Sequence, residues 1–97
     1  MHHPSPAIYI MTNKPYGTLY TGVTIHLIKR VYQHKRRLTP GFASQYGCKR
    51  LVYFEHFDTI TDAIAREKQI KAGSRKRKIA LIQSLNPRWE DLYETLI

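Results

Sequence analysis

The chain has 97 residues, which is enough for one domain with a single hydrophobic core and too few for two. Hydrophobic residues make up 42% of the sequence and charged residues 24%, as in ordinary folded domains, so we expect the body of the chain to fold. Sixteen Lys and Arg against seven Asp and Glu give a formal net charge of +9. The positive electrostatic field around a small, strongly basic protein favours a polyanionic partner, and nucleic acid is the first candidate.

Other classes are excluded by what the sequence lacks. No apolar run approaches the roughly 20 residues that a membrane-spanning helix needs, and residues 1–6 lack the apolar stretch of a secretion signal. We therefore expect a cytoplasmic protein with no membrane partner and with a flexible N-terminus over residues 1–6. A metal-binding structural protein that uses His2 and His3 is a weaker alternative, because adjacent terminal histidines are equally typical of a residual purification tag.

Cys48 is the only cysteine of the chain. An intramolecular disulfide and a multi-cysteine zinc site are therefore excluded, and we expect no disulfide-linked partner. We interpret Cys48 as a small, partly buried hydrophobic residue.

Two segments near the start of the chain predict a β-hairpin. Residues 7–12 and 18–24 are rich in β-branched and aromatic residues, and the turn between them contains Pro and Gly. The spacing of apolar residues then changes to that of a helix, and residues 25–38 predict a helix that ends before a Pro-Gly pair. Its inward face is expected to hold Leu27, Val31, His34 and Leu38. Residues 42–49 predict a loop or one short helical turn.

The middle of the chain predicts a third strand and two helices. Residues 51–57 are a nearly continuous aromatic and β-branched run, so we expect a strand that is covered on both faces. Residues 58–61 offer N-cap oxygens for a helix that stops at Gly73. Ser74 then caps a further helix, which runs through Ser84.

The last residues predict a closing amphipathic helix. Its apolar positions follow the i, i+3, i+4, i+7 spacing and are Trp89, Leu92, Tyr93 and Leu96. No repeat, linker or low-complexity tract interrupts the order, so residues 1–97 are expected to form a single domain. The predicted fold class is α+β, with a three-stranded, largely antiparallel sheet flanked by helices in the order β-β-α-β-α-α-α.

A carboxylate occupies an apolar position of the helix before Gly73. Glu67 lies on the stripe formed by Ala63, Ile64 and Ile70, so we expect its side chain to face inward. Burying a charge costs free energy unless a partner compensates it. Two partners remain open: a buried Arg, which periodicity slightly favours, or a hard cation such as Mg²⁺, which takes one or two carboxylates with water and phosphate oxygens.

The first predicted helix carries a related feature. Arg30 and His34 are i, i+4 neighbours that border its apolar stripe, and with Glu67 they form a set that phosphoryl chemistry uses. In that chemistry a metal polarises the phosphate, Arg neutralises charge on its oxygens, and an acid or base handles protons. An ion pair of Arg30 with Glu67, with His34 packed beside it, explains the same pattern equally well.

Two tyrosines and a glycine of the hairpin complete the polar pattern. Tyr9 and Tyr20 lie in the two predicted strands, where tyrosines usually serve packing. Gly22 shares a strand face with Tyr20. Glycine weakens a strand unless a bulge or the close approach of a ligand requires it, so Gly22 indicates one of these features.

The hairpin motifs resemble those of a known family. Ala7-Ile8-Tyr9 and Tyr20-Thr21-Gly22, one on each strand, are similar to the GIY and YIG signatures of the GIY-YIG nucleases. Residues 27–35 and 65–71 resemble the family segments that carry the Arg and His pair and the metal-binding glutamate. Residues 86–93 resemble the tail of short bacterial stand-alone members, which are related to the incision domain of the excinuclease C subunit. The resemblance covers nearly the whole chain from the first signature onward.

The resemblance implies a metal-dependent DNA endonuclease that hydrolyses phosphodiester bonds, with structure-selective cleavage linked to DNA repair or recombination. By position, its catalytic residues would be Tyr9, Tyr20, Arg30, His34 and Glu67, and Gly22 would keep the backbone close to the site. The implied roles are a tyrosine that assists the attacking water, Arg30 on the scissile phosphate, and His34 in proton transfer. Glu67 would hold one Mg²⁺ or Mn²⁺ ion.

Three residues depart from the family pattern. Ala7 replaces the first glycine and Thr21 replaces the isoleucine, which are changes in strand packing that need not touch the chemistry. Val23 stands where some relatives have a lysine that lowers a tyrosine pKa. The identity of the base is therefore open between Tyr9 and Tyr20, and we favour Tyr9.

The remaining site candidates are one asparagine and several basic residues. Asn86 corresponds either to a late asparagine of the family or to a helix terminator before Pro87, and we favour the second interpretation. Basic runs are usually solvated helix faces, but their number and the scarcity of acids favour contact with DNA phosphates. These residues are Lys35, Arg36, Arg37, Lys49, Arg50, Arg75, Lys76, Arg77 and Lys78. A non-catalytic nucleic-acid-binding module on the same fold is the alternative function.

Overall fold

The computed structural model describes residues 5–38 and 40–97, so His2, His3 and most of the expected flexible N-terminus lie outside the described residues. The elements, in chain order, are β1 (Ala7–Thr12), β2 (Leu19–Thr24), α1 (Leu27–Lys35), α2 (Phe42–Gln45), β3 (Arg50–His56), α3 (Ile60–Ala72), α4 (Arg75–Leu85) and the 3-10 helix η1 (Leu92–Thr95). This order confirms the predicted α+β class, and α2 confirms the short helical turn as the better interpretation of residues 42–49.

The three strands form a sheet in the order β2-β1-β3. Both strand pairs are antiparallel, and all six residues of the central strand β1 are buried. Tyr9 of β1 lies opposite Gly22 of β2 and opposite Phe54 of β3. Because side chains alternate along a strand, Tyr9 faces one layer of the molecule, and its neighbours Ile8 and Ile10 face the other.

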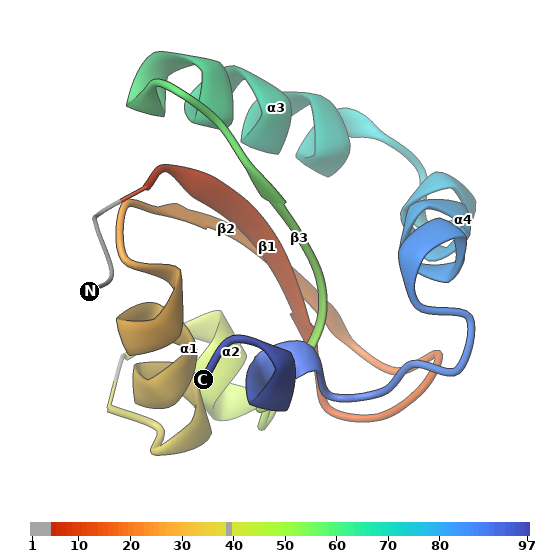
Figure 1. The fold of residues 1–97 in the computed structure, drawn as a ribbon. Helices are drawn as coiled ribbons and strands as arrows, with labels where there is room; N and C mark the ends of the chain where they lie inside the picture. The colour runs from red at the N-terminus through yellow and green to blue at the C-terminus, as the bar shows by residue number, and fades with distance from the viewer. Residues whose placement is uncertain (1–4, 39) are drawn as a thin grey trace.

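Helices cover both faces of the sheet. Figure 1 shows α3 and α4 on one side and α1, α2 and η1 on the other. On the α3–α4 side the core consists of Ile8, Ile10, Val52, Tyr53, Ala63, Ile70, Ile82 and Trp89. On the α1 side it consists of Ala7, Tyr9, Met11, Leu27, Val31, Ala43, Cys48 and Leu51. The expected cover on both faces of β3 and the interpretation of Cys48 as a core residue are thus confirmed.

The helices α3 and α4 begin where the sequence predicts. Thr59 is the N-cap of α3, and its hydroxyl accepts a hydrogen bond from the backbone N–H of Asp62 at 3.1 Å. Ser74 caps α4 in the same way and accepts from the N–H of Arg77 at 3.1 Å. Such caps satisfy N–H groups that have no partner inside the helix. In the described part of the chain, no helix has the length and apolar character needed to cross a membrane.

The helix α1 is shorter than predicted. It spans Leu27–Lys35, whereas the sequence pattern predicts residues 25–38. Arg36 is its C-cap, and Arg37 adopts a left-handed conformation with φ of 53°, which ends the helix. Leu38 is consequently 65% exposed, and its prediction as an inward residue was wrong.

The prediction of a closing amphipathic helix was also wrong. Only Leu92–Thr95 are helical, and they form a 3-10 turn. Trp89 adopts a left-handed conformation with φ of 56°, and its buried ring packs in the core on the α3–α4 side. Leu92 and Leu96 pack against the core on the α1 side instead. One short helix cannot place its apolar side chains on both faces of a sheet, so the segment between Trp89 and Leu92 is irregular.

Asn86 holds this irregular segment in place. It is the C-cap of α4, as the Asn-Pro pair predicts, and only 4% of it is exposed. Its Nδ2 donates to the carbonyl oxygens of Val52 at 3.2 Å and Glu90 at 2.7 Å. Its Oδ1 accepts from the N–H of Glu90 at 2.9 Å. These backbone partners favour the interpretation of Asn86 as a helix terminator over a place in the active site.

Removing the Asn86 amide is expected to destabilise the fold. Asn86→Ala leaves the buried carbonyl of Val52 and the part-buried backbone groups of Glu90 without their Asn86 partners, which costs about 2 kcal/mol or more. Urea denaturation measures the change in unfolding free energy. Ser84→Ala, which removes an exposed hydroxyl from the same helix, serves as the control and should change it by less than about 0.5 kcal/mol. Equal effects of the two substitutions would contradict a special role of Asn86.

Candidate active site

Three predicted site residues meet on the α1 side of the sheet. The Tyr9 hydroxyl of β1 and Nε2 of His34 on α1 are hydrogen-bonded at 2.9 Å in a buried position. The Tyr20 ring of β2 lies beside both, with its centroid 6.3 Å from that of Tyr9 and 5.3 Å from that of His34. His34 is only 3% exposed, which confirms its predicted inward position on α1. The hairpin and the first helix together thus build one cluster.

Gly22 gives the Tyr9 ring its place. A Cβ atom at Gly22 would lie 2.4 Å from the Tyr9 hydroxyl oxygen and 2.5 Å from Cζ, closer than such atoms can approach. The sequence attributed this glycine to a bulge or to the close approach of a ligand. In the folded chain the neighbouring phenol makes the close approach, because Tyr9 is the cross-strand partner of Gly22.

The Tyr9 hydroxyl is held in its protonated form. Burial raises its pKa well above the ordinary value of 10.0, and the nearby Tyr20 and the negative charge of Glu67 raise it further. The positive charge of Arg30 acts in the opposite direction, but burial is the largest effect. A tyrosine can act as a base only if nearby positive charge lowers its pKa. Arg30 supplies such charge, but the effect of burial is larger and the Tyr9 pKa stays raised.

The His34 imidazole is held in its neutral form. Burial, and then the positive charge of Arg30, lower its pKa below the ordinary value of 6.5. In the tautomer that carries its proton on Nδ1, Nε2 is an acceptor, and the Tyr9 hydroxyl donates to it. A neutral phenol and a neutral imidazole can exchange a proton along this hydrogen bond.

Glu67 approaches the cluster from the other layer. α3 packs against the edge strand β2 as well as against β1, and the Glu67 carboxylate is close enough to raise the Tyr9 pKa. Its side chain is 15% exposed and forms an ion pair with Lys71 at 3.2 Å, one helical turn away. Ile64, which was predicted to lie inward on the same stripe, is 37% exposed, so that part of the prediction was wrong.

The ion pair predicted as an alternative for Glu67 has a different partner. In residues 5–38 and 40–97, no ion pair joins Arg30 to Glu67, and Lys71 takes the place of the expected arginine. Lys71 was not predicted as the partner of Glu67, although its i+4 spacing from Glu67 is a standard signal for such a pair. The Lys71 side chain is 52% exposed, so the pair is accessible to solvent and stabilises the fold little.

The donor set near Tyr9 suits a hard divalent cation. Within the described ranges, no three His, Cys, Asp or Glu side chains gather where they could hold a metal ion. A cation here would therefore be held by the single carboxylate of Glu67, with water and phosphate oxygens in its other positions. Mg²⁺ keeps several waters and takes one or two carboxylates, so the residues present fit this ion.

Three of the nine basic candidates are bound within the protein. Lys35 forms an ion pair with Asp91, donates to the Lys49 carbonyl at 3.1 Å and lies 5.1 Å from the Tyr93 ring centroid. Arg50 donates to the Trp89 carbonyl at 2.9 Å. Arg75 donates to the carbonyls of Tyr16 at 2.6 Å and Gly17 at 2.8 Å. These contacts give Lys35, Arg50 and Arg75 structural roles that the sequence did not reveal.

The other basic candidates lie at the surface around the helix ends. Arg36 lies over the Tyr32 ring at 5.8 Å, and the Arg37 guanidinium lies against Gly47, where an added Cβ would be 2.5 Å from Nη2. The remaining candidates are Lys49, Lys76, Arg77 and Lys78, of which Lys78 is half-buried and the others are exposed. For these six residues, unlike Lys35, Arg50 and Arg75, phosphate contact remains the prediction.

Comparison with known proteins assigns the family. The GIY-YIG catalytic domain family matches residues 5–80. A UPF0213 protein of Staphylococcus saprophyticus is 39% identical over 75 residues, which cover 77% of this chain and 90% of that protein. A UPF0213 protein of Clostridium perfringens is 37% identical over 87 residues, which cover 90% of this chain and 91% of that protein.

A solved structure agrees with this assignment. The solution NMR structure of the UPF0213 protein BH0048 from Bacillus halodurans matches with a TM-score of 0.57 and 26% identity, over 90% of this chain and 92% of that chain. The chain therefore belongs to the GIY-YIG family, and the resemblance found in its sequence is confirmed. This is a family of nucleases, which act on nucleic acids and generally depend on a divalent metal.

Burial of His34 predicts a pH dependence of stability. Because its pKa is lowered on folding, the folded state binds the His34 proton less readily than the unfolded state does. The stability contributed by neutral His34 is therefore complete above the ordinary pKa of 6.5 and is lost as pH falls from there through the folded pKa. In urea denaturation between about pH 7.5 and pH 5, the free-energy difference between wild type and His34→Gln should shrink on acidification. A difference that grows would contradict the lowered pKa.

Proposed function

We propose that this domain is an endonuclease that hydrolyses phosphodiester bonds of DNA with one Mg²⁺ or Mn²⁺ ion at Glu67. The observation that carries the proposal is the buried 2.9 Å hydrogen bond between the Tyr9 hydroxyl and His34, placed within electrostatic reach of Arg30 and Glu67. A nucleophile-activating pair, a cation for the phosphate and a carboxylate for the metal are the groups that phosphodiester hydrolysis requires.

The Tyr9–His34 pair would activate the attacking water without a free phenolate. Tyr9 gains the proton of the water at its hydroxyl oxygen while it gives its own hydrogen to Nε2 of His34. The resulting hydroxide attacks phosphorus, the bond to the leaving oxygen breaks as that oxygen takes up a proton from solvent, and His34 afterwards releases its own extra proton to solvent. This route agrees with a raised Tyr9 pKa and a lowered His34 pKa, since neither group must be charged before the reaction begins.

The other residues of the cluster would act on the phosphate and the metal. Arg30 would neutralise charge that develops on the non-bridging oxygens, and Tyr20 would orient the phosphate beside Tyr9. Glu67 would hold the divalent ion, which when bound would polarise the phosphate. Gly22 would keep the Tyr9 hydroxyl in position, because any larger residue would collide with it.

Surface cations would hold the flanking DNA. Arg36, Arg37, Lys49, Lys76, Arg77 and Lys78 are free to meet phosphates, and each contact would release counterions and make the affinity depend on salt. A cytoplasmic enzyme with structure-selective cleavage in DNA repair or recombination fits this arrangement. Cleavage assays on nicked, branched, flapped and plain duplex DNA test the selectivity. Binding without cleavage of any of them, with either ion, would favour the non-catalytic binding module.

Loss of the Glu67 charge is expected to abolish cleavage. Glu67→Gln should lower the cleavage rate by about 1,000-fold or more, since the metal supplies several kcal/mol of transition-state stabilisation. Electron paramagnetic resonance of Mn²⁺ should show weaker binding, while circular dichroism shows the fold intact. Glu94→Gln, which changes an exposed carboxylate, serves as the matched control. If Glu67→Gln unfolds the domain without changing Mn²⁺ binding, its role is structural.

Tyr9 and His34 are expected to act as one unit. Tyr9→Phe and His34→Gln should each lower the single-turnover cleavage rate by roughly 100-fold or more, the usual scale of acid or base assistance. The double variant should lose hardly more than either single one, because each removes the same relay. Additive losses would contradict the relay. A fully active Tyr9→Phe together with an inactive Tyr20→Phe would assign the role to Tyr20.

A further inference from the structure

An aromatic pair formed by Phe42 and Tyr46 lies at the surface beside the active-site cluster. Phe42 opens the short helix α2 and Tyr46 is its C-cap, and the two rings contact each other with centroids 4.6 Å apart. Phe42 is 47% exposed and Tyr46 is 48% exposed. Among the ring contacts of the described residues, this is the one in which both rings belong to exposed aromatic side chains.

The aromatic pair is continuous with the catalytic cluster. The Phe42 ring lies 6.3 Å from the Tyr20 ring and is nearly parallel to it, with an interplanar angle of 22°. Tyr20 in turn contacts Tyr9 and His34. A row of rings therefore leads from the buried hydroxyl to the surface. Single exposed apolar side chains are common, but exposed rings that contact each other next to a site are not explained by packing alone.

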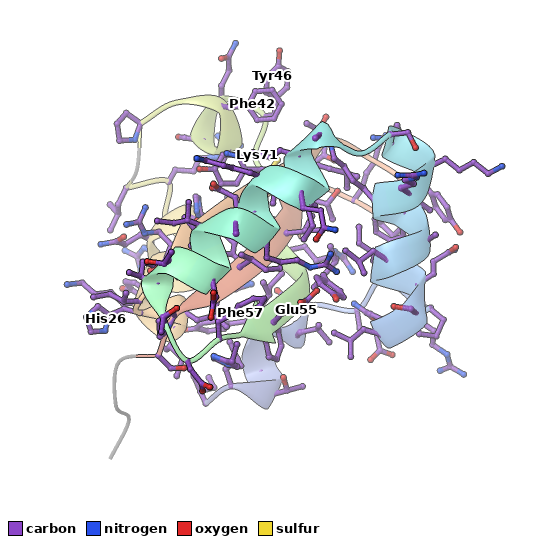
Figure 2. All side chains as sticks on the ribbon, turned by 90° about the horizontal axis from the view of Figure 1, so that it is seen from above. His26, Phe42, Tyr46, Glu55, Phe57 and Lys71 are labelled. Carbon is purple, nitrogen blue, oxygen red and sulfur yellow. The ribbon has the colours of Figure 1, made fainter. Side chains whose placement is uncertain are left out.

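The backbone of α2 holds these rings outward. Ala43 points into the core on the α1 side, which fixes the side of α2 that faces the protein. Gly41 and Gly47 flank the helix with φ of 108° and 65°, conformations that allow the chain to turn sharply on both sides of it. Figure 2 shows Phe42 and Tyr46 projecting outward from the protein.

The charges around the aromatic pair fit a nucleic-acid strand. All seven Asp and Glu residues lie at position 55 or later, so the part of the chain that forms the hairpin, α1 and α2 has no acidic residue. Arg37 lies against Gly47, next to Tyr46. Exposed aromatic rings with cations beside them are the combination that binds single-stranded nucleic acids, by base stacking and by phosphate contacts.

We propose that Phe42 and Tyr46 form a stacking site for an unpaired nucleobase next to the scissile phosphate. The ligand is a base of single-stranded nucleic acid, because the faces of duplex bases are covered by their neighbours and cannot stack on a side chain. The enzyme consequently prefers single-stranded segments, such as a flap, over continuous duplex at the cleavage position. This site deepens the proposed nuclease function and rests on it for the position of the phosphate.

The binding test separates stacking from charge. Fluorescence anisotropy, measured with EDTA present so that no cleavage occurs, compares a short fluorescein-labelled oligothymidylate with a duplex of the same length. Phe42→Leu and Tyr46→Ala should each weaken binding of the single strand by about 5- to 100-fold, the range found for one stacked base. Duplex affinity and the salt dependence of single-strand binding should remain unchanged, since no phosphate contact is removed.

The control removes an equally exposed ring elsewhere. Tyr32 on α1 is 46% exposed, so Tyr32→Ala removes a similar aromatic surface. Because Arg36 lies over this ring, any effect of Tyr32→Ala should be the same for single strand and duplex, and the ratio of the two affinities should remain unchanged. Phe42→Leu retains an apolar contact with Tyr20, and circular dichroism verifies that both test variants are folded. Equal losses on single strand and duplex, or no loss on either, would overturn the stacking site.

A direct signal of stacking completes the test. An oligonucleotide that contains 2-aminopurine should lose fluorescence on binding to wild type, and Phe42→Leu and Tyr46→Ala should restore it. Unchanged quenching by both variants would also overturn the proposal. Neither measurement involves metal or cleavage, so failure of the nuclease mechanism, seen in the Glu67 and Tyr9 variants, is distinguishable from failure of the stacking site.

Discussion

The fit of the Tyr9 ring against Gly22 is the constraint on which the cluster of Tyr9, Tyr20 and His34 depends. The two residues are cross-strand partners in the hairpin, and the phenol occupies the space that a Cβ at Gly22 would fill. Without that space the ring would have to move, and its hydroxyl would leave the 2.9 Å hydrogen bond to His34. A residue without a side chain thus determines where the Tyr9 hydroxyl lies, and the burial that follows keeps Tyr9 protonated and His34 neutral.

The position of β2 at the edge of the sheet explains how groups from both layers reach Tyr9. Arg30 and His34 come from α1 on one face, and Glu67 comes from α3 on the other, past an edge strand that has no further neighbour in the sheet. Arg30 and Glu67 shift the Tyr9 pKa in opposite directions. If they were paired with each other, each would cancel the charge that the other offers to phosphate or metal. The pairing of Glu67 with the exposed Lys71 instead leaves Arg30 available.

The sequence predicts the parts of this fold that depend on local chemistry. The hairpin, the caps at Thr59 and Ser74, and the inward position of His34 follow from turn residues, side-chain oxygens and helical period. The role of Gly22 could not be predicted, because it depends on the register of β1 against β2. The closing helix was mispredicted because the helical spacing from Trp89 to Leu96 does not reveal where each side chain packs. Trp89 packs in the core on the α3–α4 side of the sheet, and Leu92 and Leu96 pack against the core on the α1 side.

The positive net charge likewise predicts a nucleic-acid partner, but it does not predict which Lys and Arg side chains contact that partner. Lys35, Arg50 and Arg75 have the same side chains as their neighbours, yet each binds a group from a segment far along the chain. Lys35 joins α1 to the C-terminal segment, Arg50 joins β3 to that segment, and Arg75 joins α4 to the hairpin turn. Desolvating a cation to contact DNA would break such a bond, so these three are poor phosphate ligands even where they lie near the surface. The remaining cations lie at the C-terminal end of α1, just before β3 and in the first turn of α4. Because α1 and α4 cover opposite faces of the sheet (Figure 1), a nucleic acid that contacts all of these cations must reach around the domain from one face to the other.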